Sequence, residues 1–165
     1  KLLTLSRKVI EDLKLSKKPI IQFCGPISTG GFGSIDENIN SMQSYIDCAK
    51  NMKFSVFDQL SYERTLDNIL GNEKGYDYPL LYFFYKPVLE SGLIDIFIFL
   101  PLWETSIGSK WESDLIKSMN MKMYFINNSF PDEIRKIVEQ FSRVLRGPSK
   151  DRASVRHGCC CAVRE

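Results

Sequence analysis

The sequence predicts an α/β fold, a flavodoxin- or Rossmann-like three-layer sandwich around a parallel sheet of four to five strands. Short apolar runs alternate with segments whose apolar residues recur every three or four positions, as strands alternate with amphipathic helices. The run 93–100 is apolar almost throughout, which is typical of a strand covered on both faces. The length of 165 residues favours one domain, which we assign to residues 1–146.

The individual elements follow from local signals. Asp36 is a plausible N-cap for the second helix, Pro79 suits the start of a later helix, and Pro87 should break or kink that helix. The pattern stops after Arg146, so residues 147–165 are expected to form a flexible, basic tail that carries cysteines. The predicted strands are 19–24, 54–57, 93–100 and 121–126, and the predicted helices are 2–16, 36–50, 61–70, 79–86, 109–119 and 131–145.

Composition excludes several classes of function. The net charge of +2 is too small to indicate nucleic acid or a membrane as partner, and no apolar run approaches the length of a membrane span. The only histidine, His157, lies in the tail, which removes Ser-His-Asp and Cys-His arrangements and a His-rich metal site. We therefore expect no metal and no cofactor.

The cysteines favour a reducing, cytoplasmic compartment, because their odd number and spacing give neither a disulfide framework nor a zinc pattern. Cys24 and Cys48 are interpreted as small buried hydrophobic residues. The run 159–161, with Arg152 and Arg156, could form a lipidated membrane contact, but a disordered tail is the simpler interpretation.

A glycine-rich loop, residues 25–34, follows the first predicted strand and precedes a helix. Glycines let backbone N–H groups approach an anion, and a helix N-terminus adds partial positive charge. The loop is neither a Walker loop nor a complete Gly-x-Gly-x-x-Gly fingerprint, so a flexible surface loop is the alternative. Its candidate substrate-binding residues are Gly25, Pro26, Ile27, Ser28, Thr29, Gly30 and Gly31.

A second segment follows the third predicted strand and ends in Glu112. Its small residues Ser106, Gly108 and Ser109 leave room for a ligand at the carboxyl end of the sheet. We expect Glu112 in the first turn of the next helix, where the helix dipole would keep the carboxylate ionised. An ionised carboxylate can attack a sugar anomeric carbon as the base leaves. The alternative is that Glu112 only decorates a helix start.

Together, the Gly25-Pro26-Ile27 loop and Ser106-x-Gly108-x-x-x-Glu112 resemble the nucleoside 2-deoxyribosyltransferase superfamily, and most closely its 2′-deoxynucleoside 5′-phosphate N-hydrolases. The resemblance covers roughly residues 19–126. It implies that Glu112 is the nucleophile and that Ser106, with the loop 28–31, binds the phosphate. It also implies a homodimer, in which Asn127 or Ser129 would complete the phosphate site of the neighbour.

The chain departs from the family at the position of the general acid, which is Pro87 here. Asp77 and Glu90 are the nearest replacements, and Asp77 ranks first because it lies in a predicted loop. The stretch 58–78 is expected to form a lid or to line the base pocket. Lys110 could offer charge to a phosphate, although exposure to solvent is commoner for a lysine.

Four further side chains have two interpretations each. Three aromatic side chains could stack on a base or pack in the core, and core packing is the commoner role. Asp95 interrupts an apolar strand and needs partners there, so we expect a structural role for it. The aromatic candidates are Tyr62, Trp103 and Trp111.

The function predicted from these patterns is hydrolysis of the N-glycosidic bond of a nucleoside 5′-monophosphate, with a 2′-deoxynucleotide as the first candidate. Glu112 would be the nucleophile and Asp77 the acid. The alternatives are transfer of deoxyribose between bases, cleavage of NAD, and a non-catalytic nucleotide-binding module. The sequence alone does not name the base or the sugar.

Overall fold

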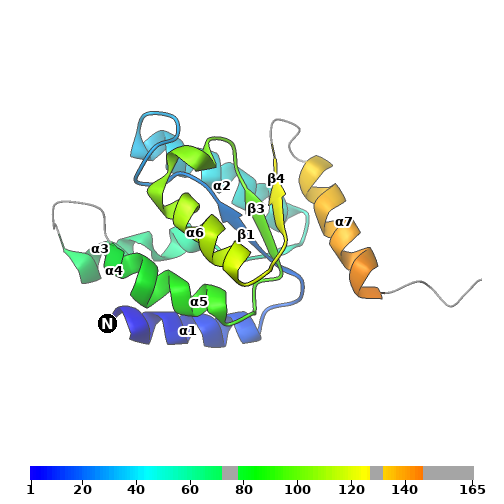
Figure 1. Ribbon diagram of the computed structural model, residues 1–165, viewed down its shortest axis with the longest axis horizontal. Coiled ribbons are helices and arrows are strands. Elements are labelled where there is room, and N and C mark those ends of the chain that lie inside the picture. The colour runs from blue at the N-terminus through cyan, green and yellow to red at the C-terminus, as the bar shows by residue number, and fades with distance from the viewer. Residues whose placement is uncertain (72–77, 127–131, 147–165) are drawn as a thin grey trace, which may run out of the picture.

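The protein is an α/β domain built on a four-stranded parallel sheet, as a computed structural model shows (Figure 1). The structure describes residues 1–71, 78–126 and 132–146, with only the backbone for 144–146. The strand order is β2-β1-β3-β4, and all neighbouring strands are parallel. The predicted fold class is confirmed. The strands are β1 (Ile20–Cys24), β2 (Ser55–Val56), β3 (Ile96–Phe99) and β4 (Met123–Phe125).

Helices fill the intervals between the strands, close to where the sequence predicts them. The stretch 58–71 contains a 3₁₀ turn, η1, followed by a short helix, and a further 3₁₀ turn, η3, precedes α6. The elements are α1 (Leu2–Lys14), α2 (Ile35–Asn51), η1 (Gln59–Tyr62), α3 (Glu63–Leu70), α4 (Tyr78–Leu80), η2 (Leu81–Tyr85), α5 (Lys86–Glu90), η3 (Trp103–Thr105), α6 (Ile107–Ser118) and α7 (Asp132–Arg146).

The core consists of two apolar layers, one on each face of the sheet. Successive side chains of a strand point to opposite faces, so Ile20 and Cys24 of β1 enter one layer and Ile21 and Phe23 enter the other. The first layer packs on α1, α3 to α5 and α6, and the second packs on α2 and α7. Helices on both faces explain why β1 and β3 are buried along their whole length.

The N-cap of α2 differs from the predicted one. Ser34 caps this helix by accepting a hydrogen bond from the Glu37 amide at 3.2 Å, and its hydroxyl donates to the Glu37 carboxylate at 3.1 Å. The first of these bonds satisfies an amide at the helix start, and the second orients the cap. The assignment of Asp36 as the cap was wrong, and Asp36 lies in the first turn instead.

Pro87 does not break the helix in which it lies. The five residues before α5 form a π-helical turn, and the Lys86 amide donates to the Leu81 carbonyl. A wide turn accommodates a residue that has no N–H and whose ring crowds the preceding turn. Pro87 then lies at the N-terminus of α5, where its missing amide costs no helical hydrogen bond.

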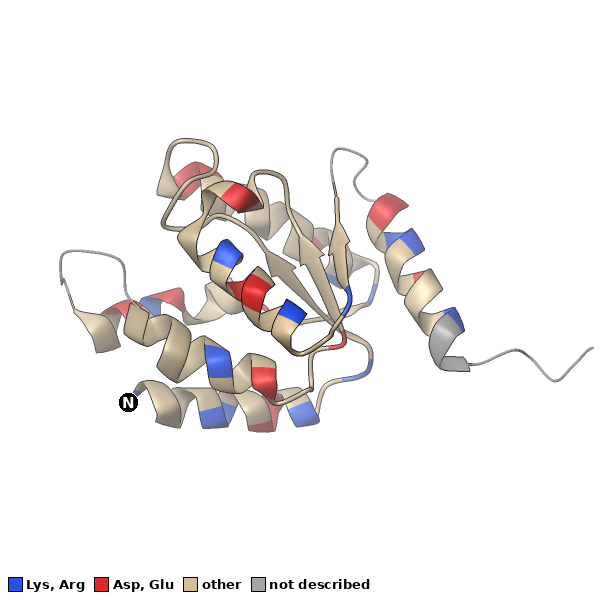
Figure 2. Ribbon diagram, in the orientation of Figure 1, with Lys and Arg blue, Asp and Glu red and all other residues tan. Residues whose placement is uncertain are grey.

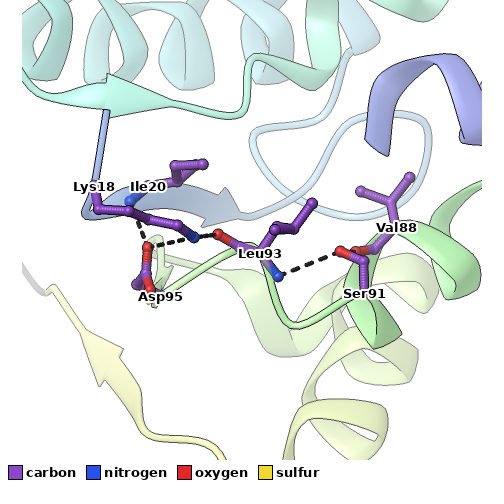
Figure 3. A network of polar contacts seen from close by, with 6 residues as sticks. All are labelled: Lys18, Ile20, Val88, Ser91, Leu93 and Asp95. Carbon is purple, nitrogen blue, oxygen red and sulfur yellow. Dashed lines mark hydrogen bonds and ion pairs between the residues drawn. The ribbon is translucent and has the colours of Figure 1, made fainter. Parts of the chain in front are cut away.

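Asp95 ties together the amino ends of β1 and β3 (Figure 3). Its carboxylate accepts a hydrogen bond from the Ile20 amide at 2.8 Å and pairs with Lys18 Nζ at 3.0 Å. Lys18 Nζ also donates to the Leu93 carbonyl. In parallel strands this edge lies opposite the carboxyl ends, so the expected structural role of Asp95 is confirmed.

Charged residues lie on the helices and loops, and none lies in the four strands (Figure 2). Residues of both charge signs lie on the same helices, as on α6 and α7. Cys24 is buried as expected, whereas Cys48 is only half-buried. Within the described ranges, no helix has both the length and the apolar character needed to span a bilayer.

Candidate active site

A cavity lies at the carboxyl ends of β1 and β3, next to the loops that follow these two strands. In the order β2-β1-β3-β4 the chain continues from β1 to one side of the sheet and from β3 to the other. The two following loops therefore diverge and leave a crevice between them, which is where open α/β sheets bind ligands. The topology thus accounts for the position of the cavity.

Asn38 of α2 organises the glycine-rich loop. Its Nδ2 donates to the carbonyls of Ile27 at 3.0 Å and Gly30 at 2.9 Å, and its Oδ1 accepts from the Phe32 amide at 2.8 Å. Sequence reasoning missed this residue. The available signal was its position one helical turn before Met42, on the apolar stripe of α2, because a polar residue on a buried stripe needs a partner.

The loop glycines serve packing within the protein. Gly30 and Gly31 have φ values of +67° and +78°, and a Cβ on Gly31 would lie 2.1 Å from Asn38 Oδ1. The Gly31 amide donates to Thr105 Oγ1 at 2.7 Å. For Gly31, the interpretation that its amide is offered to an anion was therefore wrong, because the amide already joins the two loops that border the site.

We expect Asn38→Leu to destabilise the protein by about 2–4 kcal/mol, because it orphans two carbonyls and an amide of the loop. Urea unfolding measures the change. Asn40→Leu is the matched control, since Asn40 lies on the same helix with an exposed side chain. Equal free energies of unfolding for the two variants would show that Asn38 does not hold the loop.

The N-terminus of α6 is capped from both loops. Ser106 Oγ accepts from the Ser109 amide at 3.3 Å, and Thr29 Oγ1 accepts from the Ile107 amide at 3.0 Å. The Thr29 hydroxyl in turn donates to Ser106 Oγ at 3.5 Å. Since a hydroxyl carries one proton, this arrangement leaves the Ser106 proton available to a ligand acceptor. Ser106 is buried and lines the cavity.

Glu112 lies at the base of the site, 6% exposed. Gln22 of β1 donates from Nε2 to Glu112 Oε1 at 2.8 Å, and the Cys24 thiol is a second hydrogen-bonding partner. Burial raises the pKa of Glu112 to about 8, against the smaller opposing effect of these two hydrogen bonds. Burial, and secondly Glu112, raise the pKa of the Cys24 thiol well above its usual value.

Two expectations about Glu112 were wrong. It is the sixth residue of α6 rather than a first-turn residue, because the helix begins at Ile107. The effect of the helix dipole fades within one turn, so burial decides the protonation state of this carboxyl. With a pKa of about 8, the Glu112 carboxyl is mainly protonated at neutral pH.

Glu63 is a second acidic residue in the same cavity. Burial, and secondly the nearby Asp67 carboxylate, raise the pKa of Glu63 to about 7, while a hydrogen bond with Tyr85 acts in the opposite direction. Sequence reasoning did not single out Glu63. It lies within 58–78, the stretch expected to form a lid or line the base pocket, and it lines the cavity together with Gln59.

Seven of the site residues predicted from the sequence line the cavity. It has a volume of about 60 Å³, enough for two or three water molecules. Of the other candidates, Thr29, Gly30 and Gly31 lie behind the lining through the contacts described above, and Pro26 is buried. The lining residues are Gly25, Ile27, Ser28, Gln59, Glu63, Leu80, Leu81, Tyr85, Ser106, Gly108, Ser109 and Glu112.

The aromatic candidates are used in packing. Tyr62 contacts Phe84 with ring centroids 5.9 Å apart, and Trp103 contacts Phe99 at 4.8 Å. Trp111 meets the edge of Tyr82 at 5.9 Å. Core packing, the commoner role, therefore accounts for all three candidate side chains, and none of them lines the cavity.

The remaining candidates do not reach the site or are not described. Lys110 is exposed, and Glu90 is exposed on α5 with Lys86 at 3.8 Å. Neither residue lines the cavity. Asp77, Asn127, Ser129 and the tail 147–165 lie outside the described residues.

Three buried polar atoms near Glu112 have no hydrogen-bond partner within the described ranges: Gln22 Oε1, Gln59 Oε1 and Ser109 Oγ. They come from three elements, β1, η1 and α6. A buried polar atom without a partner is uncommon and costs free energy, so such a group in a cavity is a place where a ligand can bind.

No group of three or more His, Cys, Asp or Glu side chains in the described part of the chain is placed to hold a metal ion. Comparison with known proteins adds no relative, because no family model, no curated protein and no solved structure matches the chain.

Proposed function

We propose that the protein hydrolyses the N-glycosidic bond of a nucleoside 5′-monophosphate. The observation that carries the proposal is the pair of protonatable carboxyls, Glu112 and Glu63, that line one cavity at the carboxyl ends of the strands. Glycoside hydrolysis uses two carboxyl groups, one to attack the anomeric carbon or activate water and one to protonate the leaving group. The resemblance to the N-hydrolases adds the nucleotide as substrate class.

In this proposal Glu112 attacks C1′ and Glu63 protonates the departing base. The contact with Gln22 supports the first role, because an amide NH₂ donates and so can stabilise the ionised form of the carboxyl that attacks. The Tyr85 hydroxyl beside Glu63 can donate or accept, so it fits either protonation state of that carboxyl. Water then attacks C1′ of the glycosyl-enzyme and releases the sugar phosphate. Asp77, ranked first from the sequence, remains the alternative acid.

The two pKa values predict a narrow pH optimum. The reactive form needs Glu112 ionised and Glu63 protonated, yet their pKa values are about 8 and about 7. As the pH rises, Glu112 ionises while Glu63 loses its proton. The reactive form is therefore a minor population, which is largest at a pH between the two pKa values. We therefore expect a bell-shaped dependence of kcat/KM on pH with a maximum between 7 and 8.

The phosphate is assigned to the Ser106 side of the cavity. Ser106, the N-cap of α6, and Gly108, in the first turn of that helix, line the cavity together with Ser28 of the glycine-rich loop. A helix N-terminus and hydroxyl donors suit an anion. By the same resemblance, we propose a homodimer in which Asn127 or Ser129 of a second copy completes this site, and the cysteine pattern supports a cytoplasmic location.

The size of the cavity adds a requirement. Ligand pockets usually have volumes of about 300–1,000 Å³, well above the volume of this cavity. A nucleotide therefore binds only if η1 and α3 move away from α6, or if the substrate extends past the rim at Ser28. Either way, the reacting carbon has to reach Glu112.

The experiment that tests the proposal is incubation with ribo- and deoxynucleoside 5′-monophosphates, the matching nucleosides, and NAD. Free base is quantified by chromatography, with and without an added acceptor base. Base release from monophosphates alone supports the proposal, whereas dependence on the acceptor base indicates a transferase. Nicotinamide release indicates NAD cleavage. Binding without any release leaves a non-catalytic nucleotide-binding module.

We expect Glu63→Gln to lower kcat at least about 100-fold, because it removes the proton donor. It should also remove the alkaline limb of the pH profile, since that limb reports loss of the Glu63 proton. Glu90→Gln is the control, because Glu90 is an exposed carboxyl that does not line the cavity. If Glu63→Gln keeps the wild-type alkaline limb, Asp77 becomes the residue to test as the acid.

A further inference from the structure

Gln59 lines the cavity, and its buried side-chain oxygen has no hydrogen-bond partner among the described residues. It begins η1, just beyond the carboxyl end of β2, and it is 3% exposed. Its Nε2 donates to Met42 Sδ at 3.1 Å. Because a thioether can only accept, this contact fixes the amide orientation and leaves Oε1 as the atom without a partner among the described residues.

Two residues that line the cavity have unmet hydrogen-bonding groups of different kinds. Gln59 Oε1, carried by η1, is an acceptor that lacks a donor among the described residues, while the Ser106 hydroxyl, at the start of α6, has a proton that lacks an acceptor there. A phosphate dianion offers acceptors only, so it matches Ser106 and does not match Gln59. The sugar and the base do carry O–H and N–H donors. A substrate that satisfies both groups has its phosphate at Ser106 and a donor of its sugar or base at Gln59, four residues before Glu63.

We propose that Gln59 is a specificity-determining residue that accepts a hydrogen bond from a donor group at the sugar–base end of the substrate. This inference rests on the proposed N-glycosidase function. The donor is either the hydroxyl on the sugar carbon next to C1′ or an amino group of the base. A substrate that lacks the donor leaves Gln59 Oε1 unmet in the complex, and a buried unmet acceptor is the basis of strong discrimination.

The test compares four nucleotides that separate the two donors. Adenine and unsubstituted purine are each supplied as the ribonucleoside and 2′-deoxyribonucleoside 5′-monophosphate, and kcat/KM is measured for the wild type and Gln59→Leu. We expect the wild type to prefer the donor-bearing compounds by about 10- to 100-fold, and Gln59→Leu to lose that preference. Collapse of the ribo-to-deoxy ratio identifies the sugar hydroxyl, and collapse of the adenine-to-purine ratio identifies the amino group.

A stability measurement separates this role from a structural one. Gln59→Leu should raise the Tm of the ligand-free protein, because it replaces an unmet acceptor with an apolar group beside Met42. Gln43→Leu is the matched control, since Gln43 lies on α2 and bonds only Asp47 among the described residues. If Gln59→Leu keeps both substrate ratios of the wild type, the inference is overturned whatever its Tm.

The role of Gln59 can be tested even if the protein hydrolyses none of these nucleotides. Should no compound release base, the affinities of the same four nucleotides for wild type and Gln59→Leu are measured by calorimetry. A donor preference in affinity that Gln59→Leu abolishes would support Gln59 as a specificity residue of a binding site. Binding without such a preference, or no binding of any of the four, would overturn the inference.

Discussion

Glu112→Gln is expected to reduce the rate of base release by about 10³-fold or more, because it removes the nucleophile and leaves the shape of the side chain almost unchanged. Glutamine has nearly the same shape as glutamate. Its side-chain oxygen can still accept the hydrogen bond that Gln22 Nε2 makes to Glu112 Oε1 at 2.8 Å. The variant should therefore fold and bind substrate while losing turnover. Chromatography of the free base, measured at pH 7.5 with saturating substrate, gives the ratio.

Glu104→Gln is the matched control for this prediction. Glu104 lies in η3, a short distance along the chain from Glu112, but its side chain is exposed and outside the cavity lining. The control should keep wild-type turnover. Near-full turnover by Glu112→Gln would contradict the assignment of Glu112 as the nucleophile. In that case a covalent glycosyl adduct, trapped in the wild type and located by mass spectrometry, would show whether Glu63 takes the role.

The two motifs that the sequence singles out come together because of topology. Ser28 follows β1 and Ser106 follows β3, and the carboxyl ends of neighbouring parallel strands share one edge of a sheet. Two strands with apolar runs were enough to predict that edge. The local spacing from Ser106 to Glu112 then places both on α6 and its cap, and both line the cavity.

The residues that the sequence did not reveal lie on elements whose positions depend on tertiary packing. Gln59 and Glu63 come from η1 and α3, which pack on the same face of the sheet as α6. No periodicity in that stretch marks them. Gln22 did carry a signal, because it is a polar residue between Ile21 and Phe23 in an otherwise apolar strand. A buried amide in such a place needs a partner, and that partner is Glu112.

The protonation state of Glu112 shows why sequence position alone misleads about electrostatics. A carboxylate near a helix start is stabilised by the dipole by about 0.3–1 kcal/mol at an exposed site. Burial of the same group shifts its pKa by several units, and each unit corresponds to about 1.4 kcal/mol. Burial therefore outweighs the dipole, and burial depends on the packing of α6 against β1, which the local sequence does not display.

We expect the free energy of unfolding to fall as the pH rises from about 5 to 8, with Glu112 as the main cause. In the folded protein Glu112 keeps its proton until about pH 8, whereas a glutamate in the unfolded chain loses it near pH 4.5. Between these values the folded state binds more protons, so raising the pH favours unfolding. The loss is on the order of 4 kcal/mol, complete above pH 8 and absent below about pH 4.

Glu63 acts in the same direction over a narrower range, because its folded pKa is about 7. Asp58 affects stability in the opposite direction, since hydrogen bonds from Lys50 and Ser61 outweigh burial and lower its pKa. Its contribution to stability changes only below about pH 4, outside this range.

Urea unfolding at pH 5, 6.5 and 8 measures the contribution of Glu112 when the wild type is compared with Glu112→Gln. The variant should be more stable than wild type at pH 8, and the difference should shrink toward pH 5.

Glu104→Gln again supplies the control, because replacing an exposed carboxyl leaves the buried one in place. Parallel pH dependences for wild type and Glu112→Gln would contradict the burial of a protonated Glu112. Loss of turnover together with this gain in stability would instead support a functional reason for keeping the carboxyl. An ionisable group that weakens the fold at neutral pH persists where its chemistry is used, since stability and activity often oppose each other at a reactive site.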